Sequence, residues 1–321
     1  MTDINEINVH YVEQPFQTTV CKTVKLEGVG LHSGRFVRMA ICAAPANHGI
    51  KFRRVDVHNR QQLVVARSKY VDQARLCTRI VNHDGVGLET IEHLMAAFSG
   101  VGLDNAVIEI DAPEVPILDG SSQPIVEALN KVGLETLPAK RKLMLLTKPV
   151  EVSLTSGARA KLVPAEELQI DVKISFEDSA IGNQKYRYEH RNGSFISELA
   201  CARTFCQLRD IESIKNAGRA TGGSLNNAIV VDNGKILNEG GLRVEVEFAR
   251  HKALDCLGDL FLLGMPIKAH LTALLPGHAL STKLCKTLLN DPTAYKIIEA
   301  GAGSSHPESF TMPEFAAAAM A

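Results

Sequence analysis

The sequence contains no tryptophan, few aromatic residues and no long apolar run. Of its 321 residues 5% are aromatic, and 35 Lys and Arg nearly balance 36 Asp and Glu. A chain without a basic excess lacks the electrostatic footprint of a nucleic-acid-binding protein. Its longest apolar runs, such as LFLLGMP near residue 260, are far too short to cross a bilayer. We therefore expect no nucleic-acid partner and no stable membrane insertion.

The cysteines form neither a disulfide framework nor a cysteine zinc knuckle. There are seven, scattered along the chain, and no two make a CxxC pair. This pattern favours free thiols in a reducing compartment. The N-terminal stretch has neither the basic start nor the apolar core of a secretion signal. We predict a cytoplasmic protein, with a monomer as the default.

Hydrophobic periodicity predicts an α+β fold in two successive units. Residues 1–16 are polar and predict a flexible tail, followed by an N-terminal α+β domain over 17–138. A C-terminal α+β domain is predicted over 139–310, and 311–321 predicts a second flexible tail. In both units strands precede helices, which favours sheets layered with helices. The charged, proline-flanked stretch 137–149 is predicted to be the linker.

The stretch TIEHLMAAFSG, residues 90–100, predicts a helix that stops at Gly100. Its apolar residues share one face, and Glu92 and His93 lie about 100° and 200° away from it in the first turn. Alone, this pair fits two surface charges as well as part of a metal site. A second helix is predicted after Ser122, a possible cap, with Gly133 at its end.

The segment EFARHKALDCLGDLF, residues 247–261, carries the clearest chemical pattern. In a helix, His251, Asp255 and Asp259 lie at i, i+4 and i+8 and form one polar stripe. A His and an Asp one turn apart can bind a zinc ion, although a solvated helix face explains such a pair alone more simply. Asp259, which can hold a neighbouring imidazole, and the cation Lys252 favour a site.

The two helices together contain the residue types of a catalytic zinc centre. Such a centre needs three protein ligands, an open position for water, and a base that is not a ligand. His93, His251 and Asp255 can be the ligands, with Glu92 as the base. Sequence spacing does not establish that residues 93 and 251 meet in space.

Eight motifs occur in a fixed order along the chain. They are GVGLHSG (28–34), TIEHLMAA (90–97), APEVPILDGSS (112–122), ARTF (202–205), GGSLNNAIVVD (222–232), LNEGGLR (237–243), RHKALDCLGDL (250–260) and GHAL (277–280). From about residue 18 to 300 the sequence resembles the bacterial UDP-3-O-acyl-N-acetylglucosamine deacetylases, zinc-dependent enzymes of lipid A synthesis. The resemblance implies a β-α-α-β sandwich of two similar domains, each a sheet layered with helices, with the active site between them.

The resemblance also implies roles for single residues. It implies that His93, His251 and Asp255 bind Zn²⁺, with Fe²⁺ as the alternative in the cell, since both metals accept such ligands. It makes Glu92 the general base of acetate release from the acylated sugar nucleotide, the committed step of lipid A biosynthesis.

Further implied roles concern the reacting amide and the sugar. His278 is implied to be charged and to act as acid or electrostatic partner, with Asp259 orienting it. Thr204 is implied to bond the developing oxyanion, and Phe205 and Lys252 to contact the substrate. Whether Glu92 or His278 protonates the departing amine stays open.

The family also has an insertion in the second domain that forms an apolar passage for the acyl chain. Ordinary core residues are nearly as good an explanation for each matching position taken alone. Cys77 matches a cysteine near the site entrance, where an inert buried thiol is the economical role. The matching passage positions are Leu208, Ile211, Ala220, Ser224 and Leu225.

Three alternatives remain at this level. A zincin peptidase is disfavoured because the H-E-x-x-H order is absent. A different zinc amidohydrolase acting on an acylated sugar has the same residue requirements. A non-catalytic protein that binds an acylated nucleotide sugar is disfavoured by Glu92 beside His93, because a binder needs no base.

Overall fold

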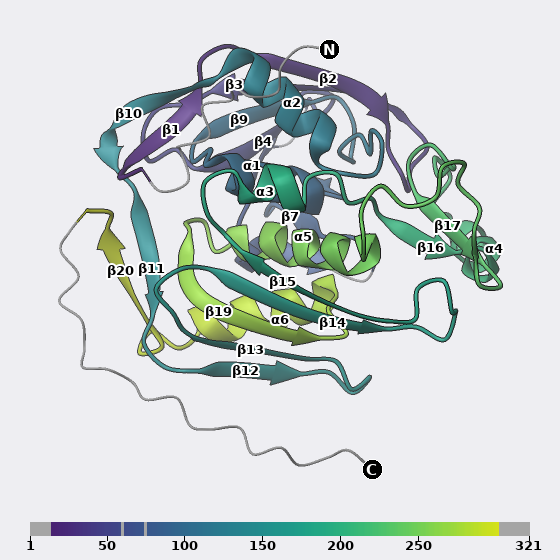
Figure 1. The fold of residues 1–321 in the computed structure, drawn as a ribbon. Coiled ribbons are helices and arrows are strands. Elements are labelled where there is room, and N and C mark those ends of the chain that lie inside the picture. Colours follow the sequence, from purple (N-terminus) through teal and green to yellow (C-terminus); the bar gives the residue numbers. More distant parts are fainter. Residues whose placement is uncertain (1–13, 59–60, 74–75, 302–321) are drawn as a thin grey trace, which may run out of the picture.

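The structure, a computed structural model, describes residues 14–58, 61–73 and 76–301 and has the predicted α+β architecture (Figure 1). All of the predicted tail 311–321, and residues 1–13 of the first tail, lie outside the described residues. The first strand already begins at Phe16, the last residue of that predicted tail. None of the helices in the described part of the chain is both long and apolar enough to cross a membrane.

In the described residues of its first half, the chain builds one five-stranded sheet, two smaller sheets and two α-helices. The five-stranded sheet has the order β2-β3-β9-β4-β5. Its strands are β2 (Val24–Val29), β3 (Phe36–Ala43), β4 (Ile50–Arg54), β5 (Leu63–Val65) and β9 (Ala106–Ile110). The other elements are β1 (Phe16–Val20), paired with β10 (Leu134–Lys140); β6 (Val71–Gln73), β7 (Arg79–Val81) and β8 (Gly87–Leu88); the 3-10 turn η2 (Ser68–Tyr70); and helices α1 (Glu92–Val101) and α2 (Gln123–Val132).

The second half, as far as residue 301, builds a seven-stranded sheet, a small three-stranded sheet and four helices. The large sheet contains β11 (Lys142–Leu146), β12 (Val150–Ser153), β13 (Arg159–Pro164), β14 (Gln169–Ser175), β15 (Asn183–Glu189), β19 (Ile267–Leu274) and β20 (Tyr295–Glu299). The small sheet contains β16 (Phe205–Gln207), β17 (Ile229–Asp232) and β18 (Lys235–Ile236), and the helices are α3 (Ser194–Glu198), α4 (Leu208–Asn216), α5 (Glu247–Phe261) and α6 (His278–Leu289).

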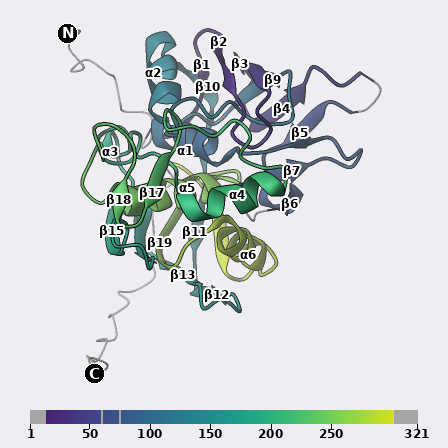
Figure 2. The same cartoon turned by 90° about the vertical axis from the view of Figure 1, so that its right-hand side faces the viewer.

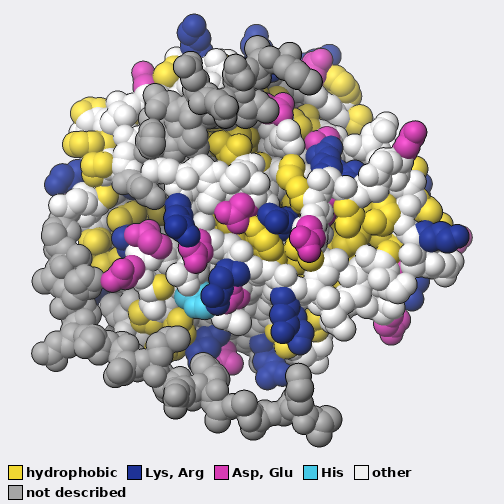
Figure 3. Space-filling view, viewed as in Figure 1, with side chains coloured by type: hydrophobic (Ala, Val, Ile, Leu, Met, Phe, Trp, Pro, Cys, Tyr) yellow, Lys and Arg dark blue, Asp and Glu magenta, His cyan; other side chains and the backbone are white. Residues whose placement is uncertain are grey.

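The helices α1 and α5 lie between the two large sheets, as both views show (Figures 1 and 2). The alternation of buried and exposed residues along the strands produces this layering. In β3, Val37, Met39 and Ile41 point into the core, while the residues between them are exposed or half-buried. On the face seen in Figure 3, acidic and basic side chains are interspersed, as the near-zero net charge leads one to expect.

A glycine lets α1 and α5 approach each other closely. A Cβ atom at Gly258 of α5 would lie 2.1 Å from the carbonyl oxygen of Glu92 in α1. Any side chain at this position would push the helices apart, so the bare backbone of Gly258 brings the chemical residues of both helices together. Glycine inside a helix costs about 0.5–1 kcal/mol relative to alanine, a cost that the close packing must offset.

Two details of the predicted helices were wrong. The helix α1 does not stop at Gly100 but continues to Val101, with Gly102 in the left-handed conformation after it. Gly100 serves packing instead, since a Cβ there would lie 2.1 Å from the Phe195 ring. Ser122 is the N-cap residue of α2 as predicted, but its hydroxyl makes no cap bond and donates instead to the carbonyl of His93 at 2.7 Å.

The predicted linker over 137–149 is largely strand. Its residues continue β10 and form β11, and these strands belong to different sheets, so the strand partners change at Arg141. The Arg141 side chain anchors this crossing by donating to Asp104 at 2.7 Å and to the carbonyl of Gly102 at 2.9 Å. The charged residue that marked a linker in the sequence is 2% exposed. The domain boundary after residue 138 stays a prediction.

Candidate metal centre

Three side chains from α1 and α5 meet at the centre of the molecule. One ligand atom from each of His93, His251 and Asp255 lies within 4.8 Å of the others, and all three residues are buried. Oδ1 of Asp255 lies 3.6 Å from Nε2 of His93 and 3.4 Å from Nε2 of His251. Residues that are far apart in the sequence thus form one cluster.

The unsatisfied atoms of the cluster fit a divalent cation. Nδ1 of His251 donates to the carbonyl of Ala202 at 3.1 Å, which leaves Nε2 with its lone pair directed at the cluster. One oxygen of Asp255 accepts from Nζ of Lys252 at 2.9 Å, and the other, Oδ1, is buried without a hydrogen bond. Two imidazoles and a carboxylate that converge on one point are a donor set typical of a catalytic metal site.

The electrostatics keep these donors in their metal-binding protonation states. Burial lowers the pKa of His93 to about 4 and that of His251 to about 3, so both rings are neutral at pH 7. Burial opposes ionisation of Asp255, but the neighbouring His251 and Lys252 outweigh it and hold the pKa of this carboxyl well below its usual range.

Glu92 lies beside the cluster without being one of its three donors. It is 3% exposed, and its Oε2 accepts from the backbone N–H of Thr78 at 3.0 Å. Its Oε1 lies 3.6 Å from Nε2 of His278. Burial raises the pKa of Glu92 to about 7, against the lowering effect of His278. The surface-charge interpretation of Glu92 and His93 is therefore wrong.

His278, the first residue of α6, forms a buried charge pair with Asp259. Its Nδ1 donates to Oδ2 of Asp259 at 2.9 Å. Burial alone would lower the pKa of His278, but Asp259 and Glu92 outweigh it and raise the pKa to about 10. The imidazole is therefore cationic at neutral pH.

Thr78 is a site residue that the sequence did not reveal. Its hydroxyl donates to Oδ1 of Asp259 at 2.7 Å, and its N–H donates to Glu92. One fully buried residue before β7 thus braces both carboxylates on either side of His278. The sequence RLCTRIV (75–81) contains no signal for this role of Thr78, because a threonine beside a short strand is common.

Phe205 and Lys252 lie next to the cluster. The centroids of the Phe205 and His251 rings lie 6.2 Å apart, and Nζ of Lys252 lies 5.4 Å from the centroid of the Phe205 ring. Thr204 precedes β16, where its N–H donates to the carbonyl of Gly120 at 2.8 Å. Backbone contacts of Thr204 thus tie the second half of the chain to the first, while the role of its hydroxyl stays a prediction.

Cys77 is buried beside Arg219, whose guanidinium lies 3.1 Å from the sulfur. Burial raises the pKa of the Cys77 thiol to about 12, with the Glu92 carboxylate acting in the same direction. The thiol is therefore neutral at pH 7, which supports the prediction of an inert thiol. Arg219 also donates to Glu89 at 2.6 Å and was not singled out from the sequence.

The predicted passage residues lie in and after α4, away from the core. No residue of α4 is buried, and Leu208 and Leu225 are 42% and 49% exposed. Ile211 and Ala220 are half-buried, and Ser224 is exposed. The explanation of these positions as ordinary core residues is therefore wrong.

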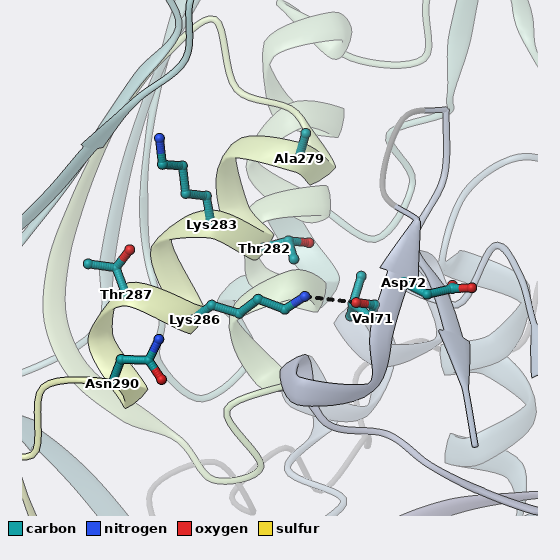
Figure 4. A pocket seen from close by; sticks show the side chains of 8 residues that line it. All are labelled: Val71, Asp72, Ala279, Thr282, Lys283, Lys286, Thr287 and Asn290. Carbon is teal, nitrogen blue, oxygen red and sulfur yellow. Dashed lines mark hydrogen bonds between the residues drawn. The ribbon is translucent and has the colours of Figure 1, made fainter. Parts of the chain in front are cut away.

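A surface groove along α6 lies outside this chemistry. Lys286 of α6 reaches across it and donates to the carbonyl of Val71 at 2.8 Å (Figure 4). The other lining residues are Asp72, Ala279, Thr282, Lys283, Thr287 and Asn290, and none of them is a predicted site residue.

An α+β sandwich with a buried His-His-Asp cluster and an adjacent carboxylate defines the class of candidate metallohydrolases. Residues 17–290 match the LpxC family model, described as UDP-3-O-acyl N-acetylglycosamine deacetylase. The chain belongs to this family, as the ordered motifs predicted.

Named relatives agree with the family match. The UDP-3-O-acyl-N-acetylglucosamine deacetylase of Myxococcus xanthus (strain DK1622) is 43% identical over 284 residues, which cover 88% of this chain and 90% of the relative. Proteins of the same name from Shewanella sp. (strain ANA-3) and Shewanella halifaxensis (strain HAW-EB4) are 40% and 41% identical over 300 residues, 93% of this chain and 97% of each relative.

Proposed function

We propose that this protein hydrolyses the N-acetyl group of UDP-3-O-acyl-N-acetylglucosamine and releases acetate, the committed step of lipid A biosynthesis. The observation that carries the proposal is the convergence of His93, His251 and Asp255 beside Glu92, in a chain that matches the deacetylase family over residues 17–290. We further propose that it acts as a cytoplasmic monomer of two α+β domains.

His93, His251 and Asp255 would hold the metal ion, which we propose to be Zn²⁺, with Fe²⁺ as the alternative in the cell. A divalent ion bound there supplies Lewis-acid activation of a water molecule and of the amide carbonyl. The neutral imidazoles and the ionised carboxylate are ready to bind without losing protons at pH 7.

Glu92 is the general base of the proposed reaction. A carboxylate whose pKa lies at about 7 can accept a proton from the attacking water and release it again near neutral pH. Thr78 fixes the carboxylate by donating its N–H to Oε2. The water oxygen bonds to the amide carbon, the C–N bond breaks, and acetate and the sugar amine leave.

His278 stabilises the negative charge that develops on the amide oxygen, or donates a proton to the departing amine. Its cationic ring, held by Asp259, suits both roles because it is charged and preorganised. The hydroxyl of Thr204 supplies a further hydrogen bond to the oxyanion. The amine receives its proton from Glu92 or from His278.

The remaining residues bind the substrate. Phe205 contacts the sugar, Lys252 contacts polar groups of the substrate while paired with Asp255, and Cys77 lies near the entrance. Exposed apolar side chains at Leu208 and Leu225 support an acyl-chain passage, which Ile211, Ala220 and Ser224 would also line.

The first experiment measures acetate release from the acylated sugar nucleotide. We expect Glu92→Gln to lose on the order of 10²- to 10⁴-fold in kcat, because the variant keeps the shape of the side chain but cannot accept a proton. Glu127→Gln, at an exposed position of α2, is the matched control. Full activity of the Glu92 variant would exclude the proposed mechanism.

The second experiment measures bound metal in His93→Ala. We expect loss of the metal with an intact circular dichroism spectrum, whereas the exposed His83→Ala should keep the metal. An unchanged metal content in His93→Ala would contradict the ligand assignment.

A further inference from the structure

Glu114 is a buried carboxylate to which the mechanism above gives no role. It lies in the motif APEVPILDGSS and is 1% exposed. Oε1 accepts from the N–H of His32 at 2.8 Å and from the hydroxyl of Thr90 at 2.9 Å. Oε2 accepts from the N–H of Ser33 at 2.8 Å. The carboxylate thus accepts from two separate segments of the chain, and Oε1 joins the two.

The loop that contains His32 is shaped around this carboxylate. A Cβ atom at Gly30 would lie 2.4 Å from Oε2 of Glu114, so only glycine leaves room for the carboxylate here. The loop closes on itself where Gly34 donates its N–H to the carbonyl of Gly30 at 3.0 Å. The carboxylate is therefore a built-in part of the loop.

The second segment contains a strained residue. Thr90 has φ = +58°, in the left-handed region that β-branched residues strongly disfavour. Such a conformation persists only where its surroundings hold it. The bond from the Thr90 hydroxyl to Glu114 does so directly, and the neighbouring Glu89 adds a main-chain bond from its N–H to Pro113 at 2.9 Å.

The conformation of Thr90 sets the direction in which α1 begins. Ile91 follows it as the N-cap residue, and the first two residues of α1 are Glu92 and His93. A change of φ at Thr90 would rotate this first turn and with it both site side chains. Displacements of about 1 Å at a reacting centre can lower rates about 10²-fold.

We propose that Glu114 is a positioning residue for the reaction proposed above. It holds Thr90 in the left-handed conformation and thereby fixes Glu92 and His93, and it keeps the His32 loop against the same turn. The expected loss of kcat rests on the proposed function. The expected loss of Zn²⁺ affinity rests only on the geometry of the metal cluster.

The test begins with Glu114→Gln, with Glu109→Gln as the matched control. The amide keeps the shape of the side chain but must turn an NH₂ group toward at least one of three donors. Glu109 lies nearby on β9 and is half-exposed, paired with Arg53. We expect kcat and the affinity for Zn²⁺, measured by competition with a chromogenic chelator, each to fall about 10- to 100-fold in the Glu114 variant only.

A second variant keeps the proposal testable if Glu114→Gln does not fold. Thr90→Val keeps the β-branch and loses the hydroxyl, so it should reproduce the losses of kcat and of Zn²⁺ affinity. Thr90→Ser keeps the hydroxyl and should retain most of the kcat and of the Zn²⁺ affinity. The double variant should be no worse than the more impaired single variant, because both residues act through the same contact.

Several outcomes would overturn the proposal. They are unchanged kcat and Zn²⁺ affinity in Glu114→Gln, losses that multiply in the double variant, or a lowered melting temperature with normal Zn²⁺ affinity. A wild-type protein that binds Zn²⁺ but releases no acetate would refute the proposed function instead, and the Zn²⁺ affinities would still decide the role of Glu114.

Discussion

The helix pair α1–α5 and the segment from α4 to Leu225 differ in how far water reaches them. All ten residues of α1 are buried, whereas no residue of α4 is. In the pair, all but two side chains are buried among neighbours, as a site that must hold atoms in place requires. In the outer segment, apolar side chains remain free to meet a ligand. The contrast separates the residues of the chemistry from those of the predicted acyl-chain passage.

The largest expected effect comes from Gly258→Ala. The added methyl group would lie 2.1 Å from the carbonyl oxygen of Glu92 and must push α1 away from α5. We expect destabilisation of about 1–3 kcal/mol in urea unfolding and loss of bound metal. Gly28→Ala, whose methyl group would meet neighbours only at 3.4 Å or more, is the control. Normal metal content in Gly258→Ala would show that the close approach is unnecessary.

A smaller effect is expected in acid, from buried His190. Burial, with help from Arg141, lowers the pKa of His190 to about 4 from 6.5. Between pH 6.5 and 4 the unfolded chain therefore binds a proton at His190 that the folded chain does not bind. The free energy of unfolding decreases as the pH falls below about 6.5. At pH 5 this amounts to about 2 kcal/mol. Urea unfolding at pH 7 and pH 5 should show a smaller difference for His190→Gln than for wild type. An equal difference would exclude His190 as a source of acid lability.

The smallest effect on stability is expected from Leu225→Ser. Because the side chain is 49% exposed, unfolding free energy should change by no more than about 0.5 kcal/mol. KM for the long-chain acyl substrate should rise, while turnover of a short-chain analogue stays unchanged. Leu63→Ser, at a leucine that is 38% exposed on β5, should leave both unchanged. An unchanged KM in Leu225→Ser would remove this residue from the passage.

The site could be predicted from the sequence where its residues share a helix, and less where they do not. The i, i+4 spacing placed His251 and Asp255 together, since helix geometry is local. The meeting of His93 with them depends on Gly258, whose importance is visible only once α1 packs on α5. The first turn of α1 looked solvent-facing because a helix with one apolar stripe is expected to expose its other side. Here the second half of the chain covers that side.

The strand alternation predicted the fold class well, but the sequence did not predict that 137–149 is largely strand. Charge and proline around Arg141 suggested a linker, yet the guanidinium is buried against Asp104 and the chain continues as strand. A buried ion pair of this kind leaves no local signal, because its partner lies elsewhere in the sequence. Thr78 was missed for the same reason.

The complete burial of α1 also bears on how the chain folds. The first half alone would leave this helix, with Glu92 and His93, without the cover that α5 provides. Neither half would then be expected to be stable as a separate fragment, and unfolding should be a single cooperative transition. Assembly of the active site and completion of folding would coincide, so partly folded chains would have no metal centre to load.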